Sequence, residues 1–329
     1  MLMAAGLGTR LRPMTEVLPK PLVPLMGVPM IQYAVDLALE AGVSQLVANI
    51  HHLPEKSRRG FAQLDLRTFA QGEGIPQLSI SDESTQLLGS AGGIKKALPL
   101  LGEGPFLLLN SDVLCDLPIQ TLLRQHQVLR RRFGVTMTLA LRLVRNAHGR
   151  YREIRFDSHS QLVTGVGELV EGRPYFSGVA VVEPEALAAV PPQGAAEFLP
   201  SILLPETNAH RVGAYLFEGD WFDIGSPMLW QKTHLELMRR LETGSLRGSW
   251  RRRIETASRR VSSEIWVAGR DTLSPDVTSW QNPCFWGKGH STSALAPLSL
   301  SKGSVVYGEL LSPADRAIVS FEGAQSESF

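Results

Sequence analysis

The stretch that decides the fold stands at the amino end: Ala4-Ala5-Gly6-Leu7-Gly8-Thr9-Arg10-Leu11-Arg12-Pro13, followed by Leu18-Pro19-Lys20-Pro21-Leu22. A short apolar segment precedes it, so the glycines are predicted to form a loop at the end of a strand. Such a loop lets backbone N–H groups approach phosphate oxygens closely. Arg10 and Lys20 add positive charge to the same window. The stretch therefore predicts a cradle for a phosphorylated ligand.

Two common glycine loops do not fit this stretch. A dinucleotide-binding loop needs three glycines in the pattern G-x-G-x-x-G, and here Gly6 and Gly8 are followed by Leu11 in place of the third. A P-loop ends in Gly-Lys-Ser or Gly-Lys-Thr, which is absent here. The loop belongs to another class of phosphate binder.

Outward from the loop, residues 1–240 alternate between strand-like and helix-like segments. Strands are predicted at 45–50, 105–109, 135–144, 177–182 and 212–217, and helices at 29–41, 121–131 and 228–241. Gly42 stands where a helix C-cap is expected. Alternation of this kind indicates an α/β domain with a mostly parallel sheet, in which ligands bind beyond the carboxyl ends of the strands.

The composition and periodicity of the sequence change after residue 243. Residues 244–260 are basic and are predicted to form a solvated helix or linker. Residues 261–329 lack helical periodicity and are predicted to form a small β-rich region, with a degenerate left-handed β-helix as one hypothesis. No regular six-residue repeat is present, which excludes a complete acyltransferase solenoid.

Composition narrows the classes of function. The chain has 329 residues, 43% of them hydrophobic and 20% charged, with a formal net charge of +1. These values suit a globular protein and give no support to a nucleic-acid partner. No run of 18 apolar residues and no signal-peptide pattern is present, and the two cysteines, Cys115 and Cys284, make no disulfide framework. A cytoplasmic location is expected, and whether the short first strand is complete stays open.

Residues 1–240 resemble the sugar-phosphate nucleotidylyltransferase family. The resemblance rests on Gly-Thr-Arg and Pro-Lys-Pro-Leu, together with the segments 49–52 (Asn-Ile-His-His), 88–93 (Leu-Gly-Ser-Ala-Gly-Gly), 110–112 (Asn-Ser-Asp), 176–178 (Phe-Ser-Gly) and 221–227 (Trp-Phe-Asp-Ile-Gly-Ser-Pro). It implies a Rossmann-like three-layer α/β/α nucleotidyltransferase domain over residues 1–243. The implied enzyme joins a nucleoside monophosphate from an NTP to a sugar 1-phosphate, releases pyrophosphate and uses Mg²⁺.

The resemblance also implies roles for individual residues. Asp112 and Asp223 would hold the metal, and with Arg10 and Lys20 they would form the catalytic set. The residues that would contact the nucleotide are Ala4, Ala5, Gly6, Gly8, Thr9, Arg10, Gly89, Ser90, Ala91, Gly92 and Ser111. The turn at 89–93 would close over the base and ribose with its backbone groups. Read alone, each aspartate is better explained as a helix cap.

The sugar pocket departs from the family pattern. Many relatives carry a Glu-Lys-Pro segment, where this chain has Glu171-Gly172-Arg173-Pro174. The expected sugar-phosphate residues are Lys20, Arg173, Gly178 and Glu197. His51 and His52 are adjacent on a strand and point to opposite faces, so a structural role is expected for them rather than a shared ion.

Several alternatives remain open at this stage. The segment 88–93 and the β-rich tail favour a mannose-1-phosphate guanylyltransferase, which uses GTP. The compact amino-terminal half also fits a uridylyltransferase that uses UTP with N-acetylmuramate or glucose 1-phosphate. A catalytically inactive subunit that senses nucleotide sugars is a third hypothesis, and a glycosyltransferase with Asp112 and Asp116 as its acidic pair is a fourth. A homo-oligomer formed through the carboxyl-terminal region is a further hypothesis.

Overall fold

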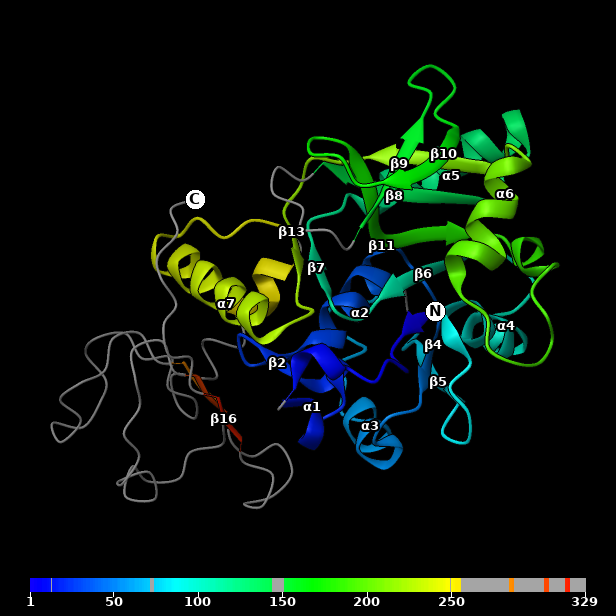
Figure 1. The fold of residues 1–329 in the computed structure, drawn as a ribbon. Coiled ribbons are helices and arrows are strands. Elements are labelled where there is room, and N and C mark those ends of the chain that lie inside the picture. Colours follow the sequence, from blue (N-terminus) through cyan, green and yellow to red (C-terminus); the bar gives the residue numbers. More distant parts are fainter. Residues whose placement is uncertain are drawn as a thin grey trace, which may run out of the picture.

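The computed structural model describes residues 1–12, 14–71, 74–143, 151–248 and 250–255, and three short strands beyond them. Its centre is a nine-stranded sheet (Figure 1). The main path through this sheet is β5–β4–β1–β6–β11–β8–β12. The bounds are β1 Leu2–Met3, β4 Gln45–Ile50, β5 Gln77–Asp82, β6 Phe106–Asn110, β8 Met137–Leu143, β11 Pro174–Val182 and β12 Val212–Leu216.

The sheet is mostly parallel. β1 pairs in parallel with β4 and β6, β4 with β5, and β8 with β12. β11 runs against both of its long partners, β6 and β8. A hairpin of β9 (Arg152–Phe156) and β10 (Val163–Glu168) joins the edge of β11. The carboxyl ends of β1, β4, β5 and β6 therefore meet along one edge.

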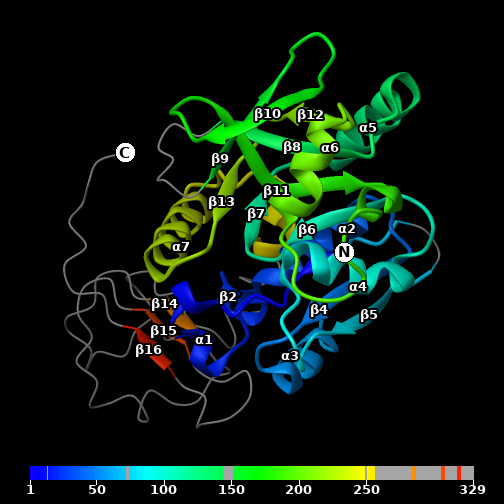
Figure 2. The same cartoon turned by 45° about the vertical axis from the view of Figure 1, so that its right-hand side comes forward.

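Helices cover both faces of the sheet, as the two views in Figures 1 and 2 show. α2 (Met30–Glu40) and α5 (Ile119–Phe133) pack on one face, where Leu107 and Leu109 point. α4 (Gly89–Leu101) packs on the other, against Phe106 and Leu108. Because neighbouring strand residues point to opposite faces, the apolar run of β6 fills both layers of core. The result is the three-layer α/β/α arrangement that was expected.

The remaining elements are short or lie at the periphery. The bounds are α1 Met14–Val17, α3 Pro54–Phe61, α6 Leu204–Asn208, α7 Pro227–Glu242, β2 Pro24–Leu25, β3 Val28–Pro29, β7 Val113–Cys115 and β13 Trp221–Asp223. Three 3₁₀ turns lie at Thr9–Leu11, Lys20–Leu22 and Pro184–Leu187, and a π-helical turn lies at Leu199–Leu203.

The strongest sequence patterns gave accurate elements. The strand predicted at 45–50 is β4, and the helix predicted at 29–41 is α2, followed by Gly42 at a φ of 81°. Among the elements that were not predicted are α3, β5, β9 and β10. They are mostly polar and only partly buried, so their hydrophobic periodicity is weak.

The basic segment after α7 packs on the α/β domain. Trp250 and Ile254 are buried in a cluster that also contains Leu11 and Met14 from the amino end. Arg253 donates to Asp36 of α2 at 2.6 and 2.7 Å and to Asp65 at 2.8 Å. Residues 250–255 are helical and serve as part of this core rather than as a solvated linker.

Little of the carboxyl-terminal region belongs to the described residues. Three strands do: β14 (Cys284–Trp286) pairs in parallel with β15 (Val305–Tyr307), which pairs antiparallel with β16 (Ala317–Val319). The hypotheses of a degenerate left-handed β-helix and of an oligomer interface concern residues that otherwise lie outside the described part.

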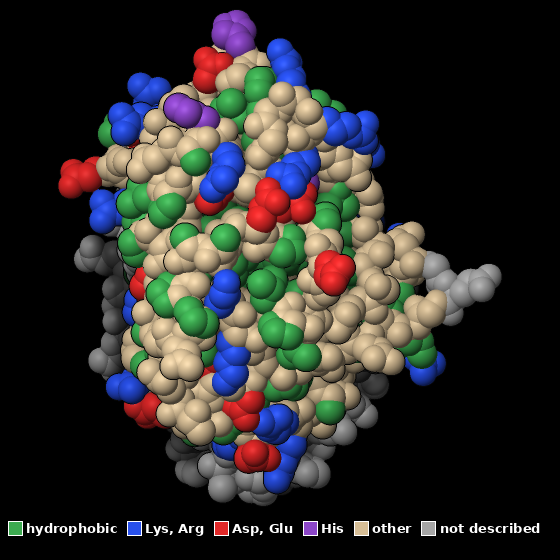
Figure 3. All heavy atoms as spheres, turned by 90° about the vertical axis from the view of Figure 1, so that its right-hand side faces the viewer, with side chains coloured by type: hydrophobic (Ala, Val, Ile, Leu, Met, Phe, Trp, Pro, Cys, Tyr) green, Lys and Arg blue, Asp and Glu red, His purple; other side chains and the backbone are tan. Residues whose placement is uncertain are grey.

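Two further observations concern the surface charge and the length of the apolar helices. On the face shown in Figure 3, basic and acidic side chains are interspersed, so this face carries no extended basic patch. Within the described residues, no helix combines the length and the apolar character needed to cross a membrane.

Candidate active site

The glycine loop after β1 is shaped by its own backbone. Gly8 has a φ of 63°, and its carbonyl accepts hydrogen bonds from the N–H of Leu11 and the hydroxyl of Thr15, both at 2.8 Å. A β-carbon at Gly8 would lie 2.7 Å from the Thr15 Cγ2, which is closer than van der Waals contact allows. Both the left-handed conformation and the close packing require glycine here. Pro13 lies outside the described residues.

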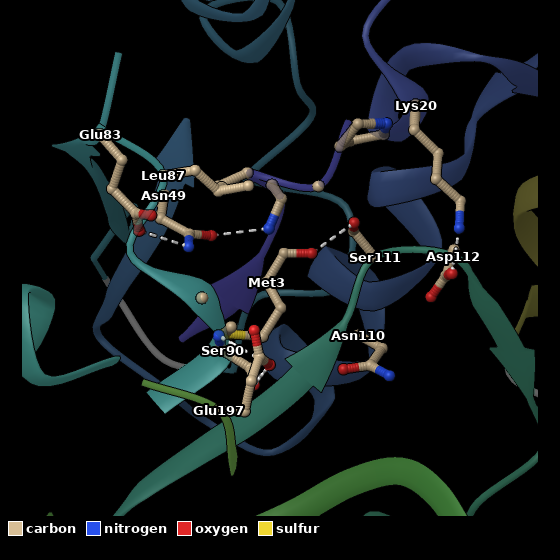
Figure 4. Close-up of a pocket in the computed structure, with 15 residues that line it drawn as sticks. Met3, Lys20, Asn49, Glu83, Leu87, Ser90, Asn110, Ser111, Asp112 and Glu197 are labelled. Carbon is tan, nitrogen blue, oxygen red and sulfur yellow. Dashed lines mark hydrogen bonds and ion pairs between the residues drawn. The ribbon is translucent and has the colours of Figure 1, made fainter. Parts of the chain in front are cut away.

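A first hollow of about 330 Å³ opens beside this loop (Figure 4). It lies at the carboxyl ends of β1, β4, β5 and β6, the edge at which parallel α/β sheets bind ligands. It is lined by Met3, Ala4, Ala5, Gly6, Lys20, Pro21, Asn49, Glu83, Leu87, Gly89, Ser90, Asn110, Ser111, Asp112 and Glu197. Six of the residues expected at the nucleotide are thus brought to one place beside the catalytic candidate Lys20: Ala4, Ala5, Gly6, Gly89, Ser90 and Ser111.

A buried polar network fixes the floor of the first hollow. The N–H of Ala4 donates to the Asn49 side-chain oxygen at 2.7 Å, and the Asn49 amide donates to Glu83 at 2.7 Å. The second oxygen of Glu83, a fully buried residue, accepts from the N–H of Leu88 at 3.2 Å. One carboxylate thereby ties the ends of β1 and β4 to the start of α4, as Figure 4 shows in part. Sequence reasoning missed Glu83 because it missed the strand that Glu83 follows.

The turn at the start of α4 differs from what was expected. The N–H groups of Ala91 and Gly92 donate to the carbonyl of Ala196 at 2.8 and 3.1 Å. In the structure these two amides are thus occupied by a carbonyl of the chain itself. The Ser90 hydroxyl donates to Glu197 at 2.6 Å, and it accepts from the N–H of Phe198 at 2.7 Å. Glu197 accordingly lines the first hollow, and it belongs with the α4 turn rather than with Gly178.

A second hollow of about 270 Å³ adjoins the first. It is lined by Arg10, Asn110, Asp112, Val113, Tyr151, Phe176, Ser177, Gly178, Trp221 and Asp223, and Asn110 and Asp112 belong to both hollows. The two-stranded ladder of β7 and β13 brings the aspartates together. It pairs Asp223 with Val113, and the N–H of Ile224 donates to the Asp112 carbonyl at 3.0 Å.

Neither aspartate caps a helix. The Ser226 hydroxyl caps α7 by accepting from the N–H of Leu229 at 3.4 Å, and α5 begins at Pro118 without a side-chain cap. The simpler interpretation of Asp112 and Asp223 as caps is therefore wrong. Both aspartates line the second hollow instead, and Asp112 also lines the first.

Each of the two carboxylates has one strong donor. The Lys20 ammonium forms an ion pair with Asp112, and the Tyr151 hydroxyl donates to Asp223. Burial raises the pKa of Asp223, as does the negative charge of Asp112, while Tyr151, Lys20 and Arg10 pull it down. Burial and the bond to Asp223 raise the pKa of Tyr151 far above its usual value, so its hydroxyl stays protonated.

The donor set fits a hard divalent cation. Carboxylates such as those of Asp112 and Asp223 are the oxygen ligands that Mg²⁺ takes from proteins, with water and phosphate oxygens completing the shell. Within the described residues, no group of three His, Cys, Asp or Glu side chains could hold a metal. A cation between Asp112 and Asp223 would therefore need ligands from solvent or from a bound phosphate.

Some expected site residues lie elsewhere. The Arg173 side chain is 64% exposed and lines neither hollow. Its Nε lies 3.6 Å from Oε1 of Glu153. Arg10 lines the second hollow rather than the first, whereas Gly8 and Thr9 shape the loop without lining either. Asp116 lines neither hollow, and the charge of Asp220 acts on it, which removes it as an acidic partner of Asp112.

The two histidines have the structural role that was expected. A ring nitrogen of His51 lies 2.6 Å from the Glu83 carbonyl, and one of His52 lies 2.7 Å from the Thr15 carbonyl. The pair thus fastens the end of β4 to two different loops.

Comparison with known proteins agrees with this geometry. The nucleotidyl transferase family model matches residues 1–238. An N-acetylmuramate alpha-1-phosphate uridylyltransferase from Neisseria meningitidis serogroup B is 29% identical over 251 residues, which are 76% of this chain and 99% of that protein. A mannose-1-phosphate guanyltransferase from Hypocrea jecorina is 30% identical over 237 residues, which are 69% of this chain and 60% of that protein.

Solved structures show the same fold. An apo UDP-glucose pyrophosphorylase superposes with a TM-score of 0.59 at 22% identity, covering 73% of this chain and 97% of the other. The family match spans both glycine segments and both aspartates of the two hollows. The chain therefore belongs to the sugar-phosphate nucleotidylyltransferase family and is an enzyme of the nucleotidyltransferase class.

Proposed function

We propose that this enzyme transfers a nucleoside monophosphate from an NTP to a sugar 1-phosphate and releases pyrophosphate. The observation that carries the proposal is the position of Asp112 at the junction of two hollows. The first hollow contains the glycine loop and would take the nucleotide. The second contains Asp223 and aromatic side chains, and it would take the sugar phosphate. The reacting phosphates would then meet beside Asp112.

The chemistry needs no activating base. A phosphate oxygen of the sugar 1-phosphate attacks the α-phosphorus, the bond from that phosphorus to the bridging oxygen breaks, and its electron pair leaves with pyrophosphate. Because a phosphate monoester is already a nucleophile, catalysis rests on positioning and on neutralising charge. Lys20 lies between the glycine loop and Asp112, where its ammonium can stabilise charge at the α-phosphate. Arg10 lies on the side of the second hollow and can bind the sugar phosphate.

Asp112 and Asp223 are the residues that would hold Mg²⁺. When bound, the ion would supply positive charge to the phosphate oxygens at which negative charge develops. The role of the two carboxylates is to fix its position at the junction of the hollows. Their mutual repulsion, visible in the raised pKa of Asp223, is relieved by a cation placed between them.

Between the two candidate nucleotides, the length of the matched region favours UTP. The alignment with the uridylyltransferase spans 99% of that protein, whereas the alignment with the guanyltransferase spans 60%. We therefore propose UTP as the donor and N-acetylmuramate 1-phosphate or glucose 1-phosphate as the acceptor. GTP with mannose 1-phosphate, which the sequence pattern favoured, is the second candidate because the guanyltransferase is 30% identical over 237 residues.

A substrate panel tests the proposal. The full chain is incubated with Mg²⁺, with each of the four common NTPs and with the 1-phosphates of glucose, mannose and N-acetylmuramate. Release of pyrophosphate that requires both the NTP and one sugar 1-phosphate is the expected result, with UTP as the best donor. Absence of pyrophosphate in every combination would instead support the inactive sensor, and Asp223→Asn serves as the inactive control.

A further inference from the structure

We propose that Tyr151 is a positioning residue that holds the Asp223 carboxylate in the orientation needed to bind the divalent cation. The inference rests on the proposed function because the cation site is part of it. The observation that carries it is the hydrogen bond from the Tyr151 hydroxyl to Asp223 Oδ2, within the second hollow. Neither motif spacing nor the family resemblance pointed to this tyrosine.

Packing leaves the Tyr151 ring little freedom. Its centroid lies 4.7 Å from that of Tyr175 and 5.6 Å from that of Trp221, in tilted and edge-on arrangements. Trp221 is fixed in turn by a 2.8 Å hydrogen bond from its indole N–H to the Ser177 carbonyl. A ring held on two sides presents its hydroxyl in one direction, and that direction is toward Asp223.

Asp223 needs such a partner because its own strand is short. β13 has only three residues, and Asp223 is the last of them. The carboxylate lies in a largely buried setting next to the negative Asp112, which repels it. A hydroxyl fixed on one oxygen opposes that repulsion and holds the carboxylate in one orientation. Hydrogen-bond partners of this kind orient metal ligands, and their loss typically costs about 10- to 100-fold in metal affinity or activity.

The neighbouring Tyr175 provides a matched control. Its ring belongs to the same aromatic cluster, 5.1 Å from Trp221 between centroids, and its hydroxyl has no hydrogen-bond partner among the described residues. Tyr151→Phe and Tyr175→Phe therefore remove the same group from the same cluster. Only the first removes a hydrogen bond to Asp223.

The experiment measures binding of Mn²⁺ alone to the full chain, by the loss of the free-ion electron paramagnetic resonance signal. Pyrophosphate release is measured beside it across metal concentrations. Tyr151→Phe should weaken Mn²⁺ binding by about 10- to 100-fold and raise the metal concentration for half-maximal rate by a similar factor. The KM for the sugar 1-phosphate should change much less, and Tyr175→Phe should behave as wild type in all three measurements.

Two results would overturn the inference. One is wild-type Mn²⁺ affinity in Tyr151→Phe. The other is an equal loss in Tyr151→Phe and Tyr175→Phe, which would assign the effect to packing of the cluster. The proposed function is tested separately, since it fails only if the wild-type chain releases no pyrophosphate, whatever its affinity for Mn²⁺.

Discussion

Two pairs of aspartates show that the same type of side chain is used in two different ways in this molecule. Asp36 and Asp65, here called the clamped pair, both accept from Arg253 at 2.6 to 2.8 Å. Asp112 and Asp223, here called the open pair, face the second hollow and are held by two separate donors, Lys20 and Tyr151. Both pairs assemble residues that are distant in the sequence.

The difference lies in what neutralises the charge. The planar guanidinium of Arg253 meets both carboxylates of the clamped pair and fills the space between them, with the Arg253 and Asp36 side chains only 11% and 2% exposed. The two carboxylates of the open pair accept from different donors, and they border two hollows. A clamped pair should therefore contribute to stability, and an open pair to binding and catalysis.

The largest expected effect concerns the open pair. Asp112→Asn and Asp223→Asn should each lower the rate of pyrophosphate release by about 10²- to 10³-fold, because each removes a charged ligand of the cation that would neutralise the reacting phosphates. Thermal unfolding should be nearly unchanged. Asp116→Asn is the control, since Asp116 lines neither hollow and should keep wild-type turnover. Near-wild-type turnover in either open-pair variant would remove that residue from the mechanism.

The clamped pair should give the opposite result. Arg253→Met leaves Asp36 buried without its cation, which should lower the free energy of unfolding by about 3–5 kcal/mol while turnover per folded molecule is kept. Urea unfolding measures the loss. Arg251→Met is the control on the same short helix, because its partner Glu255 is near the surface and such pairs contribute about 0–1 kcal/mol. Equal losses in the two variants would contradict the role of the clamp.

Substitution of Lys20 should change metal binding and turnover in opposite directions. Lys20→Met removes an ammonium that competes with a cation for Asp112, so Mn²⁺ binding without nucleotide should become several-fold tighter. Turnover should fall nevertheless, because the charge that stabilises the phosphates is lost. Mn²⁺ titration and pyrophosphate release measure the two effects. Weaker Mn²⁺ binding in this variant would show that Lys20 supports the metal rather than competing with it.

The smallest effect is a difference in ionisation. Burial and the charge of Asp112 raise the pKa of Asp223, whereas hydrogen bonds from Thr68, Arg253 and nearby amides outweigh burial at Asp65 and lower its pKa. Carboxyl carbon NMR of the metal-free chain should therefore show Asp223 titrating above the usual 3.8 and Asp65 below it. In Asp112→Asn the pKa of Asp223 should move down. An unchanged value there would mean that Asp112 does not repel it.

The two shifts affect stability with opposite signs. Asp65, with a lowered pKa, contributes stability that is present above its ordinary pKa and is lost as the pH falls through the folded value. Asp223, with a raised pKa, costs stability at neutral pH, and protonation removes that cost as the pH falls through its folded value. Acid should therefore protonate Asp223 before it protonates Asp65.

Much of the framework was predictable from local patterns. The largely apolar segments at 45–50 and 105–109 predicted buried strands, and Gly6, Gly8 and Lys20 predicted a phosphate cradle beside the first of the sheet's strands. The structure brings Gly6 and Lys20 to one hollow, while Gly8 shapes the loop. The sequence could not show which way the Arg173 side chain points, and in the structure it turns toward Glu153.

The sequence by itself determined the layered α/β framework and the glycine loop, because apolar periodicity and glycine's access to positive φ are local properties of the chain. Only the tertiary structure decided which charges meet. The β7–β13 ladder joins Asp112 to Asp223, Tyr151 reaches Asp223 from before β9, and Arg253 closes on Asp36 from beyond α7. Such pairings depend on how distant strands and helices pack, and no spacing within the sequence records that geometry.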